Sequence, residues 1–236
     1  MNMMENARMQ AFDDDLGRLR ASISEMGGLA EHAIGEAMRC LIKRDLVGAR
    51  QVVEDDRKID ALEDETERHV VGLIAQRAPT STDLREIVAA LKIAGVVERI
   101  GDYAKNIAKR VPLLEDAGKI EALSLLPEMA RIAANMVHEV LNAFVNRDIE
   151  AAIRVCDRDR AVDDFYDSIF RTLLTHMMEN PHTIGQATHL LFVAKNIERV
   201  GDHATNIAEM VYFAATGEHL AERVRGVDTL QSEGAK

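Results

Sequence analysis

The chain has 236 residues, 47% of them hydrophobic and 29% charged, which excludes disorder and low complexity for most of its length. Aromatic residues make up only 4% and tryptophan is absent, so Ala, Leu, Ile, Val and Met supply most of the apolar share. This mixture favours helices over sheets, and we expect an all-α protein. The formal net charge of −11 argues against direct binding to nucleic acid or to an anionic membrane.

The first half of the chain reads as three helices. Apolar periodicity predicts a first helix of about 30 residues, a turn at Arg44-Asp45 and a second helix that ends before Pro79. A third helix follows and carries the segment ERIGDYAKNIA at 98–108. The junction with the rest of the chain lies around residues 114–126, where a glycine interrupts the pattern and Pro127 can start the next helix.

The second half repeats the first. The segment at 98–108 returns as ERVGDHATNIA at 198–208, with eight of eleven positions identical, and residues 26–66 align without gaps to residues 129–169. The turn therefore recurs at Arg147-Asp148, and the second helix of this half ends before Pro181. We predict two tandem antiparallel three-helix bundles, each closed around its own core, at residues 1–117 and 118–222, with a polar C-terminal tail at 223–236.

Apolar seams on the helices predict the core of each bundle. On the third helix of each half, apolar residues alternate at spacings of four and three, as in a heptad pattern. Those seams are Ile93, Val97, Ile100, Ala104, Ile107 and Val111, and Val193, Ile197, Val200, Ala204, Ile207 and Val211. The seams on the second helices are Val52, Ile59, Leu62 and Thr66, and Val155, Val162, Phe165 and Ile169.

Acidic residues recur at matching positions of both halves, away from these seams. They follow one another one helical turn apart, so they share one face of each helix. The set retained in both halves is Asp56, Asp60, Asp64, Glu98 and Asp102, matched by Asp159, Asp163, Asp167, Glu198 and Asp202. By contrast, Glu63 aligns with Tyr166, so we treat Glu63 as incidental.

Repeated carboxylates at this spacing suggest a cation site. Like charges four residues apart destabilise a helix, so keeping them twice favours something that neutralises them. Oxygen ligands without Cys or paired His suit a hard ion such as iron, manganese, magnesium or calcium, with zinc also possible. Gly101 and Gly201, next to the acids, would allow a close approach of the neighbouring helix or of an ion. The alternative is a solvated acidic face that holds no ion.

Other chemistry finds little support. Residues 87–97, the most apolar stretch, are interrupted by Lys92, and no signal-peptide pattern precedes them. Cys40 and Cys156 lack the spacing of a disulfide framework or a zinc site. Phosphate-binding glycine loops and nucleophile–histidine patterns are absent from the sequence. These absences make a reducing cytoplasm the expected compartment and give no support for catalysis.

Several longer motifs resemble one known family. They are MGGLAE at 26–31, DRKID at 56–60, RAPTSTDLR at 77–85, LKIAGVVERIGD at 91–102 and FVAKNIERVGDHATNI at 192–207. From about Phe12 to Leu220 the chain resembles the PhoU family, the phosphate-uptake regulatory proteins of bacteria. The resemblance implies metal sites built from E/DxxxD motifs, here Asp56/Asp60 with Glu98/Asp102 and Asp159/Asp163 with Glu198/Asp202. Asp64 and Asp167 enter the candidate set from the repeat alone.

The resemblance also implies a function. Similar proteins are non-enzymatic negative regulators of the phosphate-starvation (Pho) response and of phosphate import. The implied partners are the phosphate-sensing histidine kinase and the ATPase subunit of the phosphate ABC transporter, so membrane association would come only through partners. A homodimer is expected. Two alternatives stay open: a carboxylate-bridged metalloenzyme, either an oxidase or a hydrolase, and a metal-free helical scaffold.

Overall fold

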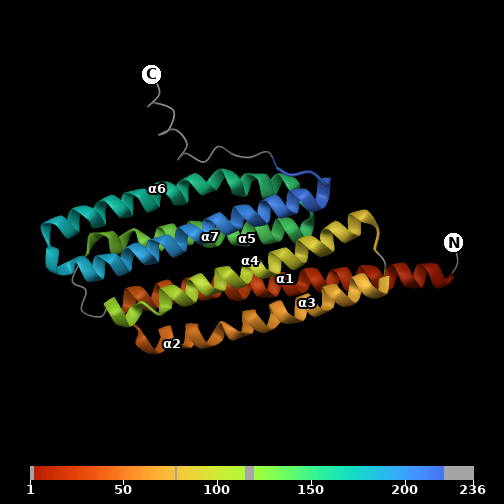
Figure 1. Cartoon of the computed structure of the whole chain (residues 1–236), viewed down its shortest axis with the longest axis horizontal. Coiled ribbons are helices and arrows are strands. Elements are labelled where there is room, and N and C mark those ends of the chain that lie inside the picture. The colour runs from red at the N-terminus through yellow and green to blue at the C-terminus, as the bar shows by residue number, and fades with distance from the viewer. Residues whose placement is uncertain (1–2, 78, 115–119, 221–236) are drawn as a thin grey trace, which may run out of the picture.

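The computed structural model describes residues 3–77, 79–114 and 120–220, and every regular element in these ranges is a helix (Figure 1). This confirms the all-α prediction. The first half contains α1 (Met3–Lys43), α2 (Leu46–Asp55), α3 (Arg57–Arg77) and α4 (Ser81–Ala108). The second half contains α5 (Leu126–Asn146), α6 (Ile149–Glu179) and α7 (Ile184–Thr216). Short 3₁₀ helices lie at η1 (Val111–Leu114), η2 (Glu121–Ser124) and η3 (Pro181–Thr183).

The repeated Arg-Asp pair forms the same turn in both halves. Arg44 and Arg147 each follow a long helix and adopt a left-handed backbone conformation with φ of 56°, which is uncommon for a residue with a side chain. The aspartate then caps the next helix: Asp45 accepts from the Gly48 amide and Asp148 from the Ala151 amide, both at 2.9 Å. The predicted turns are therefore confirmed.

Two helix boundaries differ from the prediction. The first helix spans 41 residues rather than about 30. The second helix of the first half is broken, since α2 ends at Asp55 and α3 begins at Arg57, whereas α6 runs unbroken through the matching position. At the break, Asp56 is only 4% exposed and its carboxylate accepts a hydrogen bond from Lys105 of α4. This contact between helices lies outside what periodicity along one helix can predict.

The predicted seams lie in the core. The seam of α4 from Ile93 through Ile107 is fully buried, and its continuation at Val111 is buried as well. The seam of α7 is also buried, while Leu62 and Phe165 are only partly buried against the core. The helices that carry the acidic residues therefore have the rotation that the heptad pattern predicted.

The expectation of two separate cores is wrong. The buried apolar residues of both halves form one continuous cluster, because α4 packs along α7 and α1 packs along α5 (Figure 1). Beyond its seam, α4 also buries Ile87, Ala94 and Gly101, so the helix packs against its neighbours on more than one side. The boundaries set at residues 117 and 222 stay predictions, since both positions and the tail at 223–236 lie outside the described residues.

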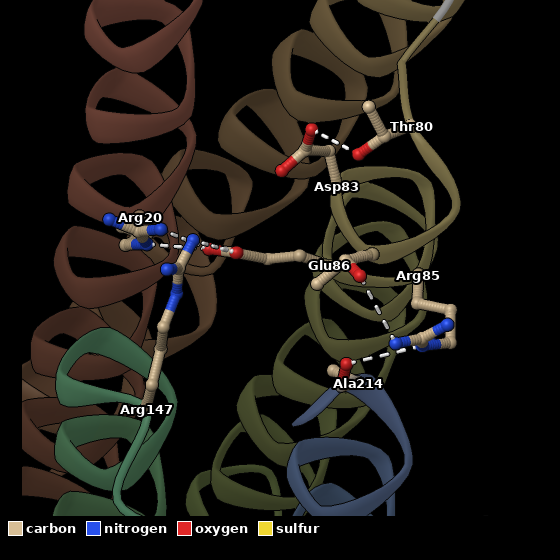
Figure 2. Close-up of polar contacts among 8 residues, drawn as sticks. Arg20, Thr80, Asp83, Arg85, Glu86, Arg147 and Ala214 are labelled. Carbon is tan, nitrogen blue, oxygen red and sulfur yellow. Dashed lines mark hydrogen bonds and ion pairs between the residues drawn. The ribbon is translucent and has the colours of Figure 1, made fainter. Parts of the chain in front are cut away.

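One buried acid joins the two halves near the start of α4 (Figure 2). Glu86, 7% exposed, accepts a hydrogen bond from Arg20 Nε of α1 at 2.6 Å and forms an ion pair with Arg147 of the second half. Beside it, Arg85 Nε approaches the Ala214 carbonyl of α7 at 3.4 Å. We call Arg20, Glu86 and Arg147 the Glu86 clasp.

Within the described ranges, no helix combines the length and the apolarity that crossing a bilayer requires.

Candidate functional site

The first acidic face lies where α4 packs beside α3 and the α2–α3 break. It comprises Asp56, Asp60, Asp64, Glu98 and Asp102. Glu98 and Asp102 are half-buried, and Asp60 and Asp64 are exposed, as expected for positions outside the apolar seam. Asp56 corrects that expectation because it is buried at the helix break.

Lys105 of α4 inserts its ammonium group between two of these carboxylates. Its Nζ lies 2.5 Å from Asp56 Oδ2 and 3.0 Å from Asp102 Oδ1. The two hydrogen bonds hold the pKa of Lys105 well above its usual range. The first face therefore already carries a positive charge at its most buried point.

The remaining carboxylates of the first face repel one another. Partial burial raises the pKa of Asp60, and the nearby Asp56 and Asp102 add to the effect. Burial also raises the pKa of Glu98, with Asp102 and Glu63 adding to it. Glu63 has a raised pKa as well, first through burial and then through neighbouring acids, so it belongs to this group. The comparison of the two halves missed Glu63 because Tyr166 stands at the matching position.

The second acidic face lies between α6 and α7. It comprises Asp159, Asp163, Asp167, Glu198 and Asp202. Asp163 and Asp167 are exposed, while the other three acids are half-buried. Partial desolvation raises the pKa of Asp163, and Glu198, Asp202 and Asp167 raise it further. The structure thus brings Asp163, Glu198, Asp202 and Asp167 into electrostatic contact from two helices.

A lysine also accompanies the second face, but at a different place. Lys195 Nζ lies 2.7 Å from Oε1 and 2.6 Å from Oε2 of Glu198, one turn along the same helix. The same ammonium lies 5.2 Å from the centre of the Tyr166 ring. At the position that matches Lys105 stands Thr205, whose hydroxyl donates to the Asp202 carbonyl at 2.7 Å.

The two glycines allow an aspartate to approach α4 and α7 closely. A Cβ on Gly101 would lie 3.2 Å from Asp56 Oδ1 and 2.8 Å from Ile59 Cδ1. A Cβ on Gly201 would lie 3.4 Å from Asp159 Oδ1. The space that these glycines leave is thus taken by the neighbouring helix and its carboxylate.

The donor chemistry of both faces fits a hard cation, since it consists of carboxylate oxygens whose mutual repulsion a cation would relieve. Within the part of the chain that the structure describes, no three His, Cys, Asp or Glu side chains converge closely enough to hold a metal ion. Binding would therefore require side chains to turn toward a common point. The metal-ligand assignment of the ten acids stays a prediction.

A family model described as the PhoU domain matches the chain twice, at residues 23–111 and 126–211. The chain is 52% identical over 227 residues to a Zymomonas mobilis protein named phosphate-specific transport system accessory protein PhoU homolog, covering 96% of both chains. A Caulobacter vibrioides protein of the same name is 43% identical over 228 residues, covering 96% of this chain and 99% of the relative.

Solved structures agree with this relationship. The crystal structure of PhoU from Pseudomonas aeruginosa superposes with a TM-score of 0.83 at 34% identity, covering 88% of this chain and all of the other. The phosphate transport system regulatory protein PhoU from Streptococcus pneumoniae gives the same TM-score at 26% identity, covering 89% of this chain. With a repeated domain match and relatives aligned over nearly the whole chain, this protein belongs to the PhoU family.

Proposed function

We propose that this protein is a regulatory accessory protein of phosphate uptake, that it negatively regulates the phosphate-starvation response, and that it is not an enzyme. The observation that supports this proposal is the similarity over 96% of the chain to relatives named phosphate-specific transport system accessory proteins. An alignment over 96% of this chain supports the same role for it.

The protein would act as a cytoplasmic adaptor, most simply as a homodimer. Its partners would be the phosphate-sensing histidine kinase and the ATPase subunit of the phosphate ABC transporter. Docking on both would bias the kinase away from phosphorylating its response regulator and would restrain import. The net charge of −11 supports contacts with proteins rather than with nucleic acid or lipid headgroups.

The acidic faces would serve this function by binding metal ions. Asp60, Glu98 and Asp102, supported by Asp56 and Asp64, would hold an ion on the first face. Asp163, Glu198 and Asp202, supported by Asp159 and Asp167, would hold one on the second. A bound iron, manganese, magnesium, calcium or zinc ion would tie neighbouring helices together and supply positive charge for docking an acidic or phosphate-bearing group.

Deleting the gene in its native host and measuring a phosphate-starvation reporter in phosphate-rich medium tests the adaptor function. We expect the deletion to raise reporter output and the wild-type gene to restore repression. Unchanged repression in the deletion strain would contradict the proposal. A Glu98→Ala/Asp102→Ala/Glu198→Ala/Asp202→Ala variant then tests the metal: if it binds none and still represses fully, docking does not depend on metal.

A further inference from the structure

The two acidic faces hold their lysines at different depths. Lys105, 25% exposed, lies between the carboxylate of Asp102 on its own helix and that of Asp56 at the α2–α3 break, and Asp56 is only 4% exposed. Lys195 is 41% exposed and pairs with Glu198 three residues away on its own helix. Lys105 thus occupies the junction between helices, whereas Lys195 stays at the edge of its face.

The sequence repeat makes this difference specific to one position. Thr205 aligns with Lys105, and a threonine hydroxyl cannot supply a positive charge. Its hydroxyl is also turned to the backbone of its own helix, 2.7 Å from the Asp202 carbonyl. The second face therefore has no ammonium group at the position where the first face has its most buried one.

An ammonium and a divalent cation compete for the same carboxylate oxygens. For a metal ion to bind Asp56 and Asp102, Lys105 must leave both of them, and Asp56 is too buried to exchange its partner for water. On the second face, Lys195 can swing into solvent by releasing a single carboxylate of its own helix. Metal binding on the first face must therefore displace an ammonium group that is more buried than the one on the second face.

We propose that Lys105 is a built-in counter-ion of the first acidic face, so that this chain binds a divalent cation on the second face in preference to the first. The proposal rests on the metal binding given above as part of the proposed function. The ammonium holds the α2–α3 break against α4 without a metal ion, whereas the matching position of the second face carries only the Thr205 hydroxyl. The two halves are therefore inequivalent in cation binding despite their matched acids.

Calorimetric titration of Mn²⁺ into chelator-stripped, full-length protein tests this with a reciprocal exchange of the two residues. Wild type should show one tight site per chain, lost in Glu198→Ala/Asp202→Ala and kept in Glu98→Ala/Asp102→Ala. Lys105→Thr should add a second site, tightening the first face by about tenfold or more. Thr205→Lys should weaken the second face by a similar factor.

Thermal unfolding guards against a variant that simply folds poorly. Lys105→Thr should lower the Tm of the metal-free protein, and Mn²⁺ should raise the Tm of this variant by more than it raises that of wild type. Lys105→Arg keeps a cation at the position and should retain the wild-type stoichiometry. Equal Mn²⁺ affinity on both wild-type faces, or no change in Lys105→Thr while Glu198→Ala/Asp202→Ala still removes Mn²⁺, would overturn the inference alone. Absence of Mn²⁺ binding in every variant would overturn the metal part of the proposed function together with it.

Discussion

The first acidic face and the second acidic face carry five matched carboxylates, yet they differ in what neutralises them. On the first face, Lys105 bridges Asp56 and Asp102 from within. On the second, Lys195 pairs with Glu198 at the edge, and Tyr166 stands where the first face has Glu63. The two halves have therefore kept the same acids while their counter-ions have diverged. Matching sets of carboxylates do not imply equal affinity for a cation.

The same divergence extends to the start of the third helix of each half. Glu86 takes part in an ion-paired clasp between the halves, whereas the matching residue is Gln186, whose buried Oε1 has no hydrogen-bond partner. The first half also breaks its second helix at Asp56, while α6 is continuous. At these two positions charged groups therefore link helices in the first half, where the second half has Gln186 and an unbroken α6.

Removing the Glu86 charge should have the largest effect. Glu86→Gln leaves Arg20 and Arg147 without their carboxylate, so we expect a loss of about 3 kcal/mol in the free energy of unfolding. Gln186→Ala, the matched control, should cost less than about 1 kcal/mol because its amide oxygen already lacks a partner. Urea denaturation measures both values. Equal losses in the two variants would contradict the role of the clasp.

Removing the ammonium group of Lys105 should have the second-largest effect on stability. Lys105→Met in metal-free protein leaves the buried Asp56 unpaired, and we expect a loss of about 2 kcal/mol, reduced by the partial exposure of the lysine. Thr205→Val on the other face removes only one hydroxyl contact and should cost about 1 kcal/mol or less. Chemical denaturation in the presence of a chelator compares the pair. A larger effect at Thr205 would reverse our assignment of the two faces.

Adding a methyl group at each of the two glycines should give a smaller difference in stability between the two faces. Alanine at Gly101 meets Ile59 and the Asp56 carboxylate that Lys105 holds in place, so Gly101→Ala should destabilise by about 1 kcal/mol. At Gly201 the contacts begin at 3.4 Å, so the better helix propensity of alanine should leave Gly201→Ala neutral or slightly more stable. The same denaturation experiment reads both. A stabilised Gly101→Ala would show that the Asp56 contact is loose.

The pH dependence of stability should be the smallest effect. Because the folded-state pKa values of Asp60, Glu98 and Asp163 lie above their ordinary values, the folded protein takes up protons first as the pH falls. The stability of metal-free protein should therefore rise as the pH falls from 7 toward the folded-state pKa values of these carboxyl groups. Asp60→Asn and Asp163→Asn should each flatten part of this rise.

Saturating Mn²⁺ provides the control for this titration. With metal bound, protons compete for the same oxygens, so stability should fall over the same pH range. The measurement is the denaturation midpoint at several pH values with and without Mn²⁺. A midpoint of metal-free protein that decreases steadily below pH 7 would contradict the raised pKa values.

Much of the fold could be predicted from the sequence because the repeat and the heptad spacing act within single helices. The Arg-Asp turns, the seam from Ile93 to Val111 and the half-buried positions of Glu98 and Asp102 follow from such local patterns. The shared core could not be predicted in this way. It depends on how the second apolar side of α4 meets α7, and either half alone could have closed around its own seam.

The candidate site was predicted in its acids but not in its counter-ions. A lysine three residues after Asp102 reads as an ordinary exposed pair, and its second contact, with Asp56, depends on the break between α2 and α3. Glu63 was set aside because Tyr166 replaces it in the repeat, although its charge adds to the field on Glu98. Comparing the basic residues of the two halves, as well as the acids, would have singled out Lys105.

Anomalous diffraction from crystals of wild-type protein grown with limiting Mn²⁺ would show which of the two acidic faces binds the ion first. We expect the first anomalous peak among Asp163, Glu198 and Asp202, with Lys105 still bridging Asp56 and Asp102. A peak of equal height on both faces, or one that appears first among Asp60, Glu98 and Asp102 with Lys105 displaced, would contradict this expectation.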